Sequence, residues 1–488
     1  MTQSPVPTPD AATTRWISAV TSWRPRPGVR TSSVSCRWIT PRLSGPRSAA
    51  IAPAGSPAPR RVPFRENSEY TSEISWYSPR VLDRPAALAR LAEAVRRSPV
   101  TALLGPRQSG KSTLARRFAE GREAAFFDLE SPADAGRLAN PELALGSLRG
   151  LVVLDEIQAL PELLPVLRVL ADRPGKPARF LVLGSASPAI VRGASETLAG
   201  RVEFVELGGF VLAEAGPHRW ERLWVRGGFP RSYLARSEAD SLAWREGFVR
   251  TFLERDVPQL GIGVPAAALR RFWTMLAHAH GQTWNGSDLG RSMGLSDKTV
   301  RSYLDLLTGT YMVRQLQPWF ENVAKRQVKA PKVYLRDTGV LHRLLSLPDR
   351  VALQGHPGVG ASFEGFVVEQ ILGAVAPADA YFWATHGGAE LDLLLVTGGR
   401  RCGVEVKLAE RPGVTRSMRV AMEDLRLSHL YVVYPGRHVV ALEERITALP
   451  VASLNELPDL LKSGGRRPPG AAGGRREETV RPKRKASP

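Results

Sequence analysis

Short apolar runs, each closed by glycine or polar residues, recur through the first half of the chain. They cover residues 100–104, 151–154, 178–184 and 202–207. The four apolar residues 151–154 are typical of a strand buried on both faces of a parallel sheet. A helix-like segment, 112–120, follows the first run. This pattern predicts an α/β fold whose first unit is an open parallel sheet, with its ligand beyond the carboxyl ends of the strands.

The segment between the first strand and its helix reads GPRQSGKS and matches the phosphate-binding pattern G-x-x-x-x-G-K-[ST] at every position. Its glycines let backbone N–H groups turn toward phosphate oxygens, and the helix after the loop presents a positive N-terminus. The lysine reaches the β and γ phosphates, and the serine hydroxyl holds Mg²⁺. We therefore expect ATP and Mg²⁺ to bind here. The expected ligand-binding residues are Gly105, Pro106, Arg107, Gln108, Ser109, Gly110, Lys111 and Ser112.

Two carboxylates, Asp155 and Glu156, follow the second apolar run. An acidic residue at a strand end beside a P-loop is placed to hold the Mg²⁺ shell, and we assign that role to Asp155. Glu156 then polarises the attacking water. The alternative is a pair of carboxylates that only keeps the strand end soluble, and the P-loop upstream argues against it.

The third run ends in polar residues, among them Ser185. At the end of a strand beside the expected γ-phosphate position, this hydroxyl would position water or sense the phosphate. An ordinary Gly-Ser turn is the competing interpretation.

Arg201 closes a helix-like segment just before the strand-like run 202–207. A guanidinium in this place can complete the ATP site of a neighbouring subunit, which would make the protein a homo-oligomer. A solvated arginine at a helix end is the alternative, because cations are favoured there.

Residues 209–268 are predicted to be mostly helical and to link the ATPase core to the C-terminal half of the chain. In FLERDVP, Arg255 and Asp256 stand just before Pro258. A proline disfavours helix in the residue before it, so we expect the helix to end here with local ion pairing.

Three helix-like segments and a strand-like segment predict a winged helix over 269–335. Ser287 and Ser296 are expected to cap the second and third helices, with Gly294 in the turn between them. On the third helix, Lys298, Arg301 and Ser302 are candidates to face DNA. Acidic residues on the same helix would repel phosphate, so a protein–protein module remains the alternative.

Two strand-like segments flank Gly398-Gly399, a two-residue hairpin signal. If these glycines form the turn, Asp392 faces Glu405 and Glu390 faces Lys407 on one face of the hairpin. Two facing carboxylates repel each other unless a cation lies between them.

A carboxylate pair with a neighbouring lysine is the D…E-x-K arrangement of Mg²⁺-dependent nucleases. The predicted catalytic residues are Asp392, Glu405 and Lys407, and the two carboxylates are predicted metal ligands. Glu364, on a helix that Ser362 is expected to cap, is a further candidate ligand. The alternative is a surface hairpin with alternating charges.

The formal charge of +20 lies largely at the two ends of the chain. Residues 1–70 carry +7 and eleven prolines, and residues 464–488 carry +6. We expect both ends to be disordered, with basic residues that add non-specific affinity for nucleic acid. Two distant cysteines and no apolar run of membrane-spanning length favour a cytoplasmic protein without a membrane partner.

The chain resembles bacterial and archaeal AAA-type ATP-binding proteins that carry a restriction-endonuclease-like domain of the PD-(D/E)xK type, a group of uncharacterised function. The resemblance covers about residues 76–454 and is carried, in chain order, by GPRQSGKS, LDEIQALP, GSAS, LAGR, RGGFP, FLERDVP, KAPKVYLRDTGVL, ASFEGFVVEQIL and AELDLLL…GVEVK. It implies an ATPase core, a winged helix and a nuclease-like fold. Ser112 stands where many relatives have threonine, which keeps the hydroxyl.

The expected organisation is α/β, with a winged helix between two α/β units. Its expected segments are a disordered tail (1–70), the P-loop core (71–208), a helical lid (209–268), the winged helix (269–335), the nuclease-like domain (336–455) and a basic disordered tail (456–488). We expect an ATPase coupled to binding or cleavage of nucleic acid. The alternative is a nucleotide-gated interaction module whose nuclease-like domain is not catalytic.

Overall fold

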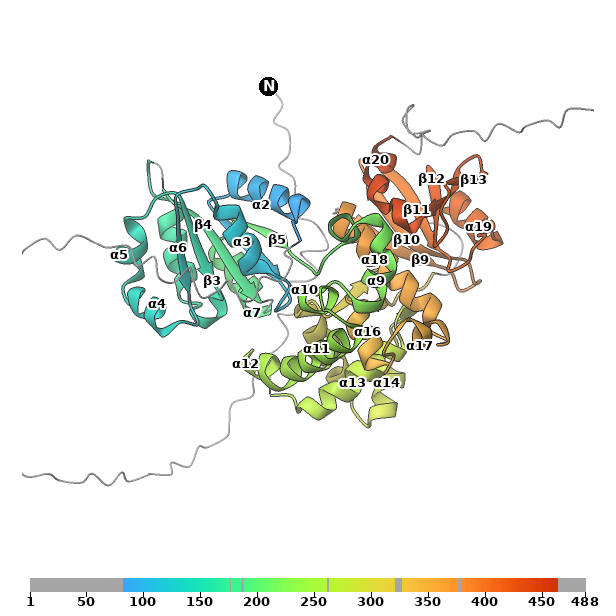
Figure 1. Ribbon diagram of the computed structural model, residues 1–488, viewed down its shortest axis with the longest axis horizontal. Coiled ribbons are helices and arrows are strands. Elements are labelled where there is room, and N and C mark those ends of the chain that lie inside the picture. Colours follow the sequence, from blue (N-terminus) through green and yellow to red (C-terminus); the bar gives the residue numbers. More distant parts are fainter. Residues whose placement is uncertain are drawn as a thin grey trace, which may run out of the picture. The chain divides into compact units, whose positions relative to one another are not determined.

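The protein is described by a computed structural model (Figure 1). The described residues are 82–175, 177–185, 188–260, 263–320, 327–375 and 379–463. The expected disorder of residues 1–70 and of 464–488 therefore falls outside the described residues.

Five parallel strands form the first sheet; four of them lie at the predicted apolar runs, and the fifth, β2, was not predicted. The strands are β1 (Val100–Gly105), β2 (Ala124–Asp128), β3 (Leu151–Asp155), β4 (Arg179–Ser185) and β5 (Val202–Glu206). Their order is β2-β3-β4-β1-β5, and every neighbouring pair is parallel. The carboxyl ends of β1, β3 and β4 therefore meet at one edge, and this edge carries the P-loop, Asp155 and Ser185.

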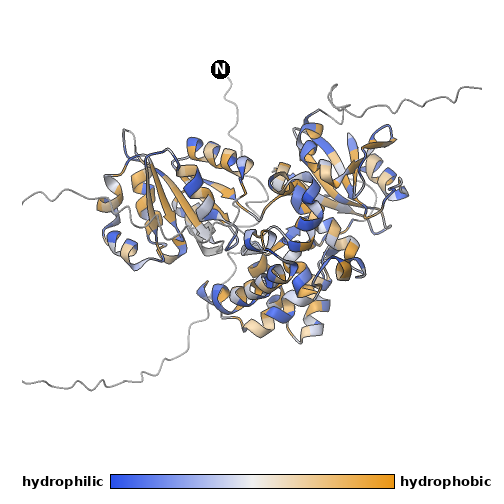
Figure 2. Cartoon of the chain, viewed as in Figure 1, coloured by the Kyte–Doolittle hydropathy of each residue, from blue (hydrophilic) through white to orange (hydrophobic). Residues whose placement is uncertain are grey.

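Apolar side chains cover both faces of this sheet, which Figure 2 shows as orange strands. Because strand side chains alternate, Leu151 and Val153 point to one face while Val152 and Leu154 point to the other. The first face packs against α2 (Pro85–Arg97) and α3 (Lys111–Ala119). The second face lies on the side of the sheet that carries the remaining helices of this part. They are α4 (Pro132–Arg137), α5 (Pro141–Gly146), α6 (Leu163–Ala171) and α7 (Pro188–Thr197). Because both faces of β3 are buried, its sequence is a continuous apolar run.

The segment after the sheet is helical, as predicted. It consists of α8 (Leu212–Ala215), α9 (Trp220–Arg226), α10 (Pro230–Tyr233), α11 (Glu238–Thr251), a π-helical turn (Phe252–Asp256) and α12 (Val257–Gln259). The expected helix end before Pro258 is wrong. The helical path continues through the π turn, and Pro258 lies in the first turn of α12, where its missing N–H costs nothing.

Three helices and a small antiparallel sheet come next. They are α13 (Ala266–His278), β6 (Gln282–Thr283), α14 (Gly286–Met293), α15 (Asp297–Gly309), β7 (Val313–Leu316) and β8 (Lys332–Leu335), with the strand order β6-β8-β7. Ser296 caps α15 by accepting from Thr299 N, as expected. Ser287 is not the cap of α14. The cap is Asn285, two residues earlier, whose side chain accepts a hydrogen bond from Asp288 N.

The last part contains a mixed six-stranded sheet in the order β13-β14-β12-β11-β10-β9. Its strands are β9 (Asp379–Ala384), β10 (Glu390–Thr397), β11 (Arg400–Val406), β12 (His429–Tyr434), β13 (Val440–Glu443) and β14 (Ile446–Pro450). The helices of this part are α16 (Thr338–Leu344), α17 (Arg350–Gln354), α18 (Val359–Val375), α19 (Arg416–Asp424) and α20 (Leu457–Lys462).

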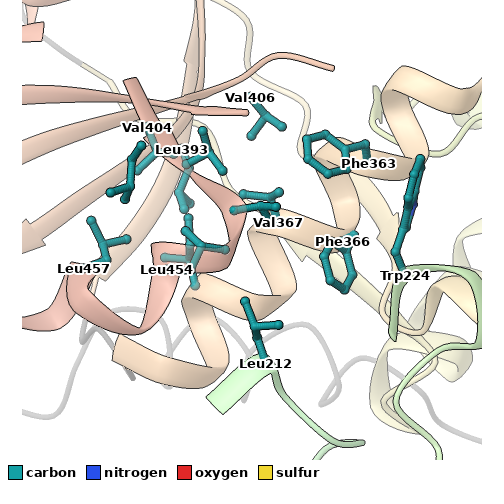
Figure 3. Packing of buried hydrophobic residues seen from close by; sticks show 14 of the residues in the cluster. Leu212, Trp224, Phe363, Phe366, Val367, Leu393, Val404, Val406, Leu454 and Leu457 are labelled. Carbon is teal, nitrogen blue, oxygen red and sulfur yellow. The ribbon is translucent and has the colours of Figure 1, made fainter. Parts of the chain in front are cut away.

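Two sequence-based boundaries in this part are wrong. The fold does not stop at residue 455, because α20 continues it, and Figure 3 shows Leu454 and Leu457 gathered with Leu393 and Val404 in one apolar cluster. Ser362 does not cap the helix that carries Glu364. It lies within α18, where its buried hydroxyl accepts a hydrogen bond from Trp224 Nε1 at 3.0 Å.

Candidate functional sites

The P-loop joins β1 directly to α3. Gly110 begins the helix with a φ of +94°, a left-handed value that disfavours other residues. Gly105 serves a different purpose from the turn we expected, because a Cβ at this position would lie 2.1 Å from the carbonyl oxygen of Leu207. Within the described chain no side chain caps the first turn of α3. Its backbone N–H groups therefore remain donors for an anion.

Lys111 is buried against the loop, with 5% of its surface exposed. Its ammonium donates to the carbonyl oxygens of Gly105 at 3.0 Å and Pro106 at 2.9 Å. Burial lowers the pKa of Lys111 to about 8, against the opposing effect of the acidic pair Glu156 and Asp155. A buried cation with only carbonyl partners is well placed to transfer its hydrogen bonds to a phosphate.

Asp155 and Glu156 lie where the sequence pattern predicts them. Asp155 is the last residue of β3, and its carboxylate accepts a hydrogen bond from the Ser112 hydroxyl. Burial raises the pKa of Asp155 above its usual value. Glu156 has a φ of +57°, and its carboxylate accepts from the Gln158 side chain. A left-handed backbone at a residue other than glycine is strained, and such strain is common at functional sites.

Ser185 ends β4 and pairs with Gly105 across the two adjacent strands. The expected position beside the P-loop is therefore present. Ser187, the other hydroxyl of this run, lies outside the described residues.

Arg201 lies at the opposite edge of the sheet from the P-loop. Its carbonyl oxygen accepts from Val100 N, at the first residue of β1, whereas the P-loop follows the last residue of that strand. Six residues of strand separate the two ends by about 17 Å. The Arg201 guanidinium binds both carboxylate oxygens of Asp172, at 2.7 and 2.8 Å. Arg201 therefore does not act on the ATP site of its own chain.

Arg107 connects the P-loop to the helical segment. Its guanidinium donates to Asp256 Oδ1 at 2.8 Å and to Glu130 Oε1 at 2.7 Å. The local ion pairing expected for Asp256 is thus wrong, because its partner lies in the P-loop. The π turn that ends in Asp256 is the irregular helical geometry often found at functional sites.

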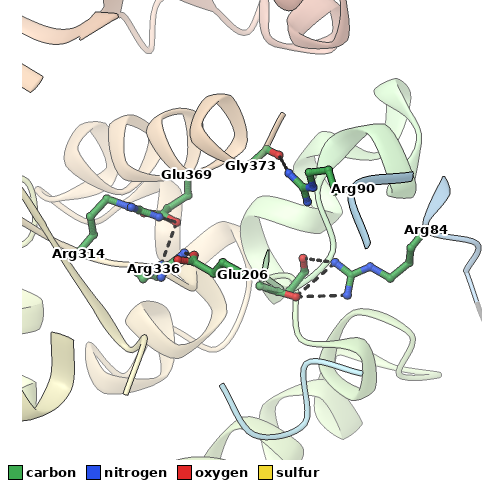
Figure 4. Close-up of polar contacts among 9 residues, drawn as sticks. Arg84, Arg90, Glu206, Arg314, Arg336, Glu369 and Gly373 are labelled. Atoms are coloured by element: carbon green, nitrogen blue, oxygen red, sulfur yellow. Dashed lines mark hydrogen bonds and ion pairs between the residues drawn. The ribbon is translucent and has the colours of Figure 1, made fainter. Parts of the chain in front are cut away.

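Arg84 supports the loop from the other side, a role that no sequence motif indicated. Its guanidinium donates to the carbonyl oxygens of Ser109 at 3.0 Å and Gly209 at 2.9 Å, and it pairs with Glu214 at 2.8 Å. Figure 4 shows the Arg84 side chain with its hydrogen bonds as dashed lines. The only local signal is its place immediately before the proline that begins α2.

The third helix of the expected winged helix, α15, has mixed charge. Lys298 is exposed. Arg301 pairs with Asp305 on the same helix at 3.1 Å, and the Ser302 hydroxyl donates to Thr299 O. Two of the three residues considered for DNA contact thus already have partners within the helix.

The β10–β11 hairpin has the predicted register as far as Leu393–Val404, and the pairs expected beyond it, Asp392–Glu405 and Glu390–Lys407, are not among the strand pairs of the described residues. Gly398 and Gly399 both have positive φ and form the turn, and the pairs Thr397–Arg400 to Leu393–Val404 keep that register. Beyond Leu393 the Asp392 carboxylate accepts from Val406 N at 2.8 Å. This bond to the Asp392 side chain takes the place of the next backbone hydrogen bond between the two strands, and it holds Asp392 against β11.

Asp392 and Glu405 are both buried, with 7% and 5% of their surfaces exposed. Burial, followed by Glu364 and Glu405, raises the pKa of Asp392 well above its usual value. The pKa of Glu405 is also raised by burial, although Lys407 opposes this with a 2.7 Å contact. Glu405 Oε2 is buried with no hydrogen-bond partner among the described residues. An unsatisfied buried carboxylate oxygen is costly and calls for an explanation.

Lys332, the first residue of β8, was not foreseen at this site. Its ammonium lies 3.0 Å from Glu364 Oε1 and 3.7 Å from Asp392 Oδ1, and it also pairs with Glu390. Although burial opposes its charge, Tyr334 and the three carboxylates raise the pKa of Lys332 well above its usual value. Across the described ranges, no three acidic, histidine or cysteine side chains are arranged to hold a metal ion. The cation among these carboxylates is a lysine.

A second charged network joins the first sheet to α18. Arg336, just after β8, pairs with Glu206 at the end of β5 and with Glu369 of α18 at 3.3 Å (Figure 4). Arg314 of β7 also pairs with Glu369. Because α18 carries Glu364 as well, one helix connects the end of the ATPase sheet to the carboxylate cluster.

Three family models match the chain in sequence. Residues 97–215 match an AAA domain, and residues 217–351 and 359–454 match two domains of unknown function, DUF8612 and DUF4143. Among the described helices, none has the length and apolar character to span a bilayer.

Two curated relatives are described as uncharacterized proteins, one of Mycobacterium bovis (strain ATCC BAA-935 / AF2122/97) and one of Mycobacterium tuberculosis (strain ATCC 25618 / H37Rv). Each is 50% identical over 410 residues, which cover 83% of this chain and 93% of the relative.

Two solved structures are also similar. A Walker-type ATPase of Pyrococcus abyssi has 15% identity and a TM-score of 0.41, over 54% of this chain and 96% of that one. The P-loop NTPase domain of the sigma-54 transport activator from E. coli has 19% identity and a TM-score of 0.19, over 26% and 98%.

Proposed function

Because the chain belongs to the family of the two mycobacterial proteins and contains an AAA domain, we propose that it hydrolyses ATP and uses this to control a Mg²⁺-dependent nuclease site. The nuclease site is the carboxylate cluster on β10 and β11. The observation that carries the proposal is the burial of Asp392 and Glu405 side by side, with one Glu405 oxygen unpaired.

At the ATP site, the loop from Gly105 to Ser112 would hold the phosphates, with Lys111 moving from the loop carbonyls to phosphate oxygens. Ser112 and Asp155, which already share a hydrogen bond, would hold Mg²⁺. The ion neutralises phosphate charge there. Glu156 accepts a proton from the attacking water as general base.

At the second site, Asp392 and Glu405 would hold a divalent ion, with Glu364 as a further ligand. The ion lowers the pKa of bound water and stabilises charge on a phosphodiester. Lys407, already 2.7 Å from Glu405, orients the water or the phosphate. The donor set fits a hard cation, since Mg²⁺ prefers carboxylate oxygens.

A nucleotide-gated interaction module is the second candidate. The observation that favours it is Lys332, which neutralises the carboxylates without any metal. In that case the C-terminal domain would bind a partner and cleave nothing.

The two functions are separated by one experiment on the full chain. Gel filtration with and without ATP gives the assembly state, and each fraction is assayed on single- and double-stranded DNA and RNA with Mg²⁺ or Mn²⁺. Cleavage by the wild type that Asp392→Asn removes supports the nuclease. Complete absence of cleavage, with ATP turnover intact, supports the interaction module.

A further inference from the structure

Lys332 occupies the middle of the carboxylate cluster. Its ammonium contacts Glu364, Asp392 and Glu390, which come from α18 and from the start of β10. Its side chain is 6% exposed, so the charge is nearly removed from water. A buried ammonium is tolerated only when it is paired, and here three carboxylates pair with it.

Two of these partners, Asp392 and Glu364, belong to the ligand set proposed for the divalent ion. The ammonium contacts Glu364 Oε1 and Asp392 Oδ1, and the other oxygen of Asp392 already accepts from Val406 N, so the lysine competes with a metal ion for these oxygens. The third proposed ligand, Glu405, has a buried oxygen without a partner among the described residues. The carboxylates proposed as metal ligands are therefore described with the lysine among them.

We propose that Lys332 is a built-in cation that holds the carboxylate cluster in a metal-free state, and that a divalent ion binds only when the lysine leaves. This inference rests on the proposed metal site and adds its regulation. Lys332 is a positioning residue here, because it acts on the ligands and not on the substrate.

The proposal is tested by titrating Mn²⁺ into the full-length protein without nucleotide and following heat or free-ion signal. Lys332→Met keeps the length of the side chain and removes the charge. We expect it to bind Mn²⁺ roughly tenfold or more tightly than the wild type, since close charges in a poorly solvated site interact strongly. Lys332→Arg keeps the charge and should bind no more tightly than the wild type.

Lys407→Met is the matched control, because it removes the other lysine beside the same carboxylates. If Lys332 affects metal binding only by long-range electrostatic repulsion, the two methionine variants will gain equal affinity for Mn²⁺. This result would overturn the proposal. Adding Asp392→Asn to Lys332→Met should remove the gain, because it deletes a ligand.

A second variant covers the case in which Lys332→Met does not fold. Glu390→Gln removes a partner of Lys332 that is about half exposed and outside the proposed ligand set. Loosening the lysine should tighten Mn²⁺ binding, whereas simple loss of a negative charge would weaken it. Weaker binding by this variant contradicts the proposal.

The same titration separates this inference from the proposed function. Equal affinity of the wild type and Lys332→Met, both lost with Asp392→Asn, leaves the metal site standing and rejects the role of Lys332. No Mn²⁺ binding by any variant rejects both.

Discussion

Arg107 in the P-loop donates a hydrogen bond to Asp256, a residue 149 positions further along the chain, at 2.8 Å. The Asp256 carboxylate also acts to raise the pKa of Lys111, so it is close enough to influence the charges of the nucleotide site. Burial raises the pKa of Asp256, while Arg107 opposes this. If Arg107 binds the phosphates of ATP, as proposed, this carboxylate from the helical segment competes with them for the arginine.

Asp256→Asn should therefore tighten ATP binding. It removes a negative charge beside the phosphates and frees Arg107, and a gain of up to about tenfold corresponds to 1.4 kcal/mol. Binding is measured with a fluorescent ATP analogue. Glu130→Gln, which removes the more exposed partner of Arg107, is the control and should have a smaller effect. Unchanged or weaker binding by Asp256→Asn would contradict this account.

Glu156→Gln should keep ATP binding and lower turnover by roughly 10²–10⁴, the usual size for a general base. The amide keeps the shape of the side chain and its contact with Gln158 but cannot accept the proton of water. Lys111→Ala should instead weaken binding, because it removes the buried ammonium. Turnover and binding are measured on the same preparations. Normal turnover by Glu156→Gln would remove this residue from the mechanism.

The strands β1, β3 and β4 could be predicted because they are buried on both faces, whereas β2, which is only partly buried, was not predicted. The run 100–104 became β1, and 202–207 became β5, with ends that differ by one residue. Turn chemistry was equally local, so Gly398-Gly399 gave both the hairpin and its register. Burial pattern and turn residues act over a few positions, which is the range that sequence patterns report.

Long-range polar contacts could not be predicted in this way. Lys332 stands 58 positions before Glu390 and 60 before Asp392, and nothing near it indicates that its partners are on another sheet. The same holds for Asp256, for which the sequence indicated an ion pair with a local neighbour and not with Arg107. The facing carboxylates did indicate that a cation was required, and the structure supplies that cation from a distant strand.

Arg201→Ala protein should be inactive alone if the arginine completes a neighbouring subunit's site. Mixing it with Glu156→Gln protein should restore part of the turnover, because mixed assemblies contain some intact shared sites. Asp172→Asn is the control: it frees Arg201 from its ion pair and keeps the guanidinium. Absence of rescue, together with a monomer in sedimentation, would assign Arg201 to a structural ion pair.

Asp392→Asn should raise the melting temperature in chelator. The amide still accepts from Val406 N, and it removes one buried charge from a cluster in which carboxylates outnumber lysines. The same variant should lose the stabilisation by Mn²⁺, which is about 2.7 kcal/mol at 100 times the dissociation constant. Its ATP turnover should stay normal. Asp459→Asn, which changes an exposed side chain on α20, serves as the control. A wild type without any metal-dependent shift would contradict the metal site.

His342 gives the fold a pH dependence that can be tested separately from both sites. It is buried in α16, and burial lowers its pKa from 6.5 to about 4. Its Nδ1 lies 3.0 Å from Val225 O, which only accepts, so Nδ1 carries the proton. Its Nε2 lies 2.7 Å from the Ser362 hydroxyl, which already accepts from Trp224. The neutral ring that the low pKa favours leaves a lone pair on Nε2, and the Ser362 hydroxyl donates its proton to it.

The sign of the effect is set by these pKa values. Below pH 6.5 the unfolded chain binds a proton at this histidine while the folded chain does not, so stability falls as the pH falls. The loss is complete near pH 4 and amounts to about 3 kcal/mol for this residue. His280, whose pKa burial lowers to about 3, adds a loss over an overlapping range. The contribution of His342 must therefore be measured as a difference between variants.

His342→Gln should unfold at lower temperature than the wild type at pH 7.5 and show a smaller fall in stability between pH 6.5 and 4. Denaturant unfolding at a series of pH values measures both. His438→Gln, at an exposed position, should follow the wild-type curve. If His342→Gln and the wild type lose stability in parallel, the buried neutral ring is not a source of the acid sensitivity. A smaller loss in the variant would show that the Trp224–Ser362–His342 chain depends on an unprotonated histidine.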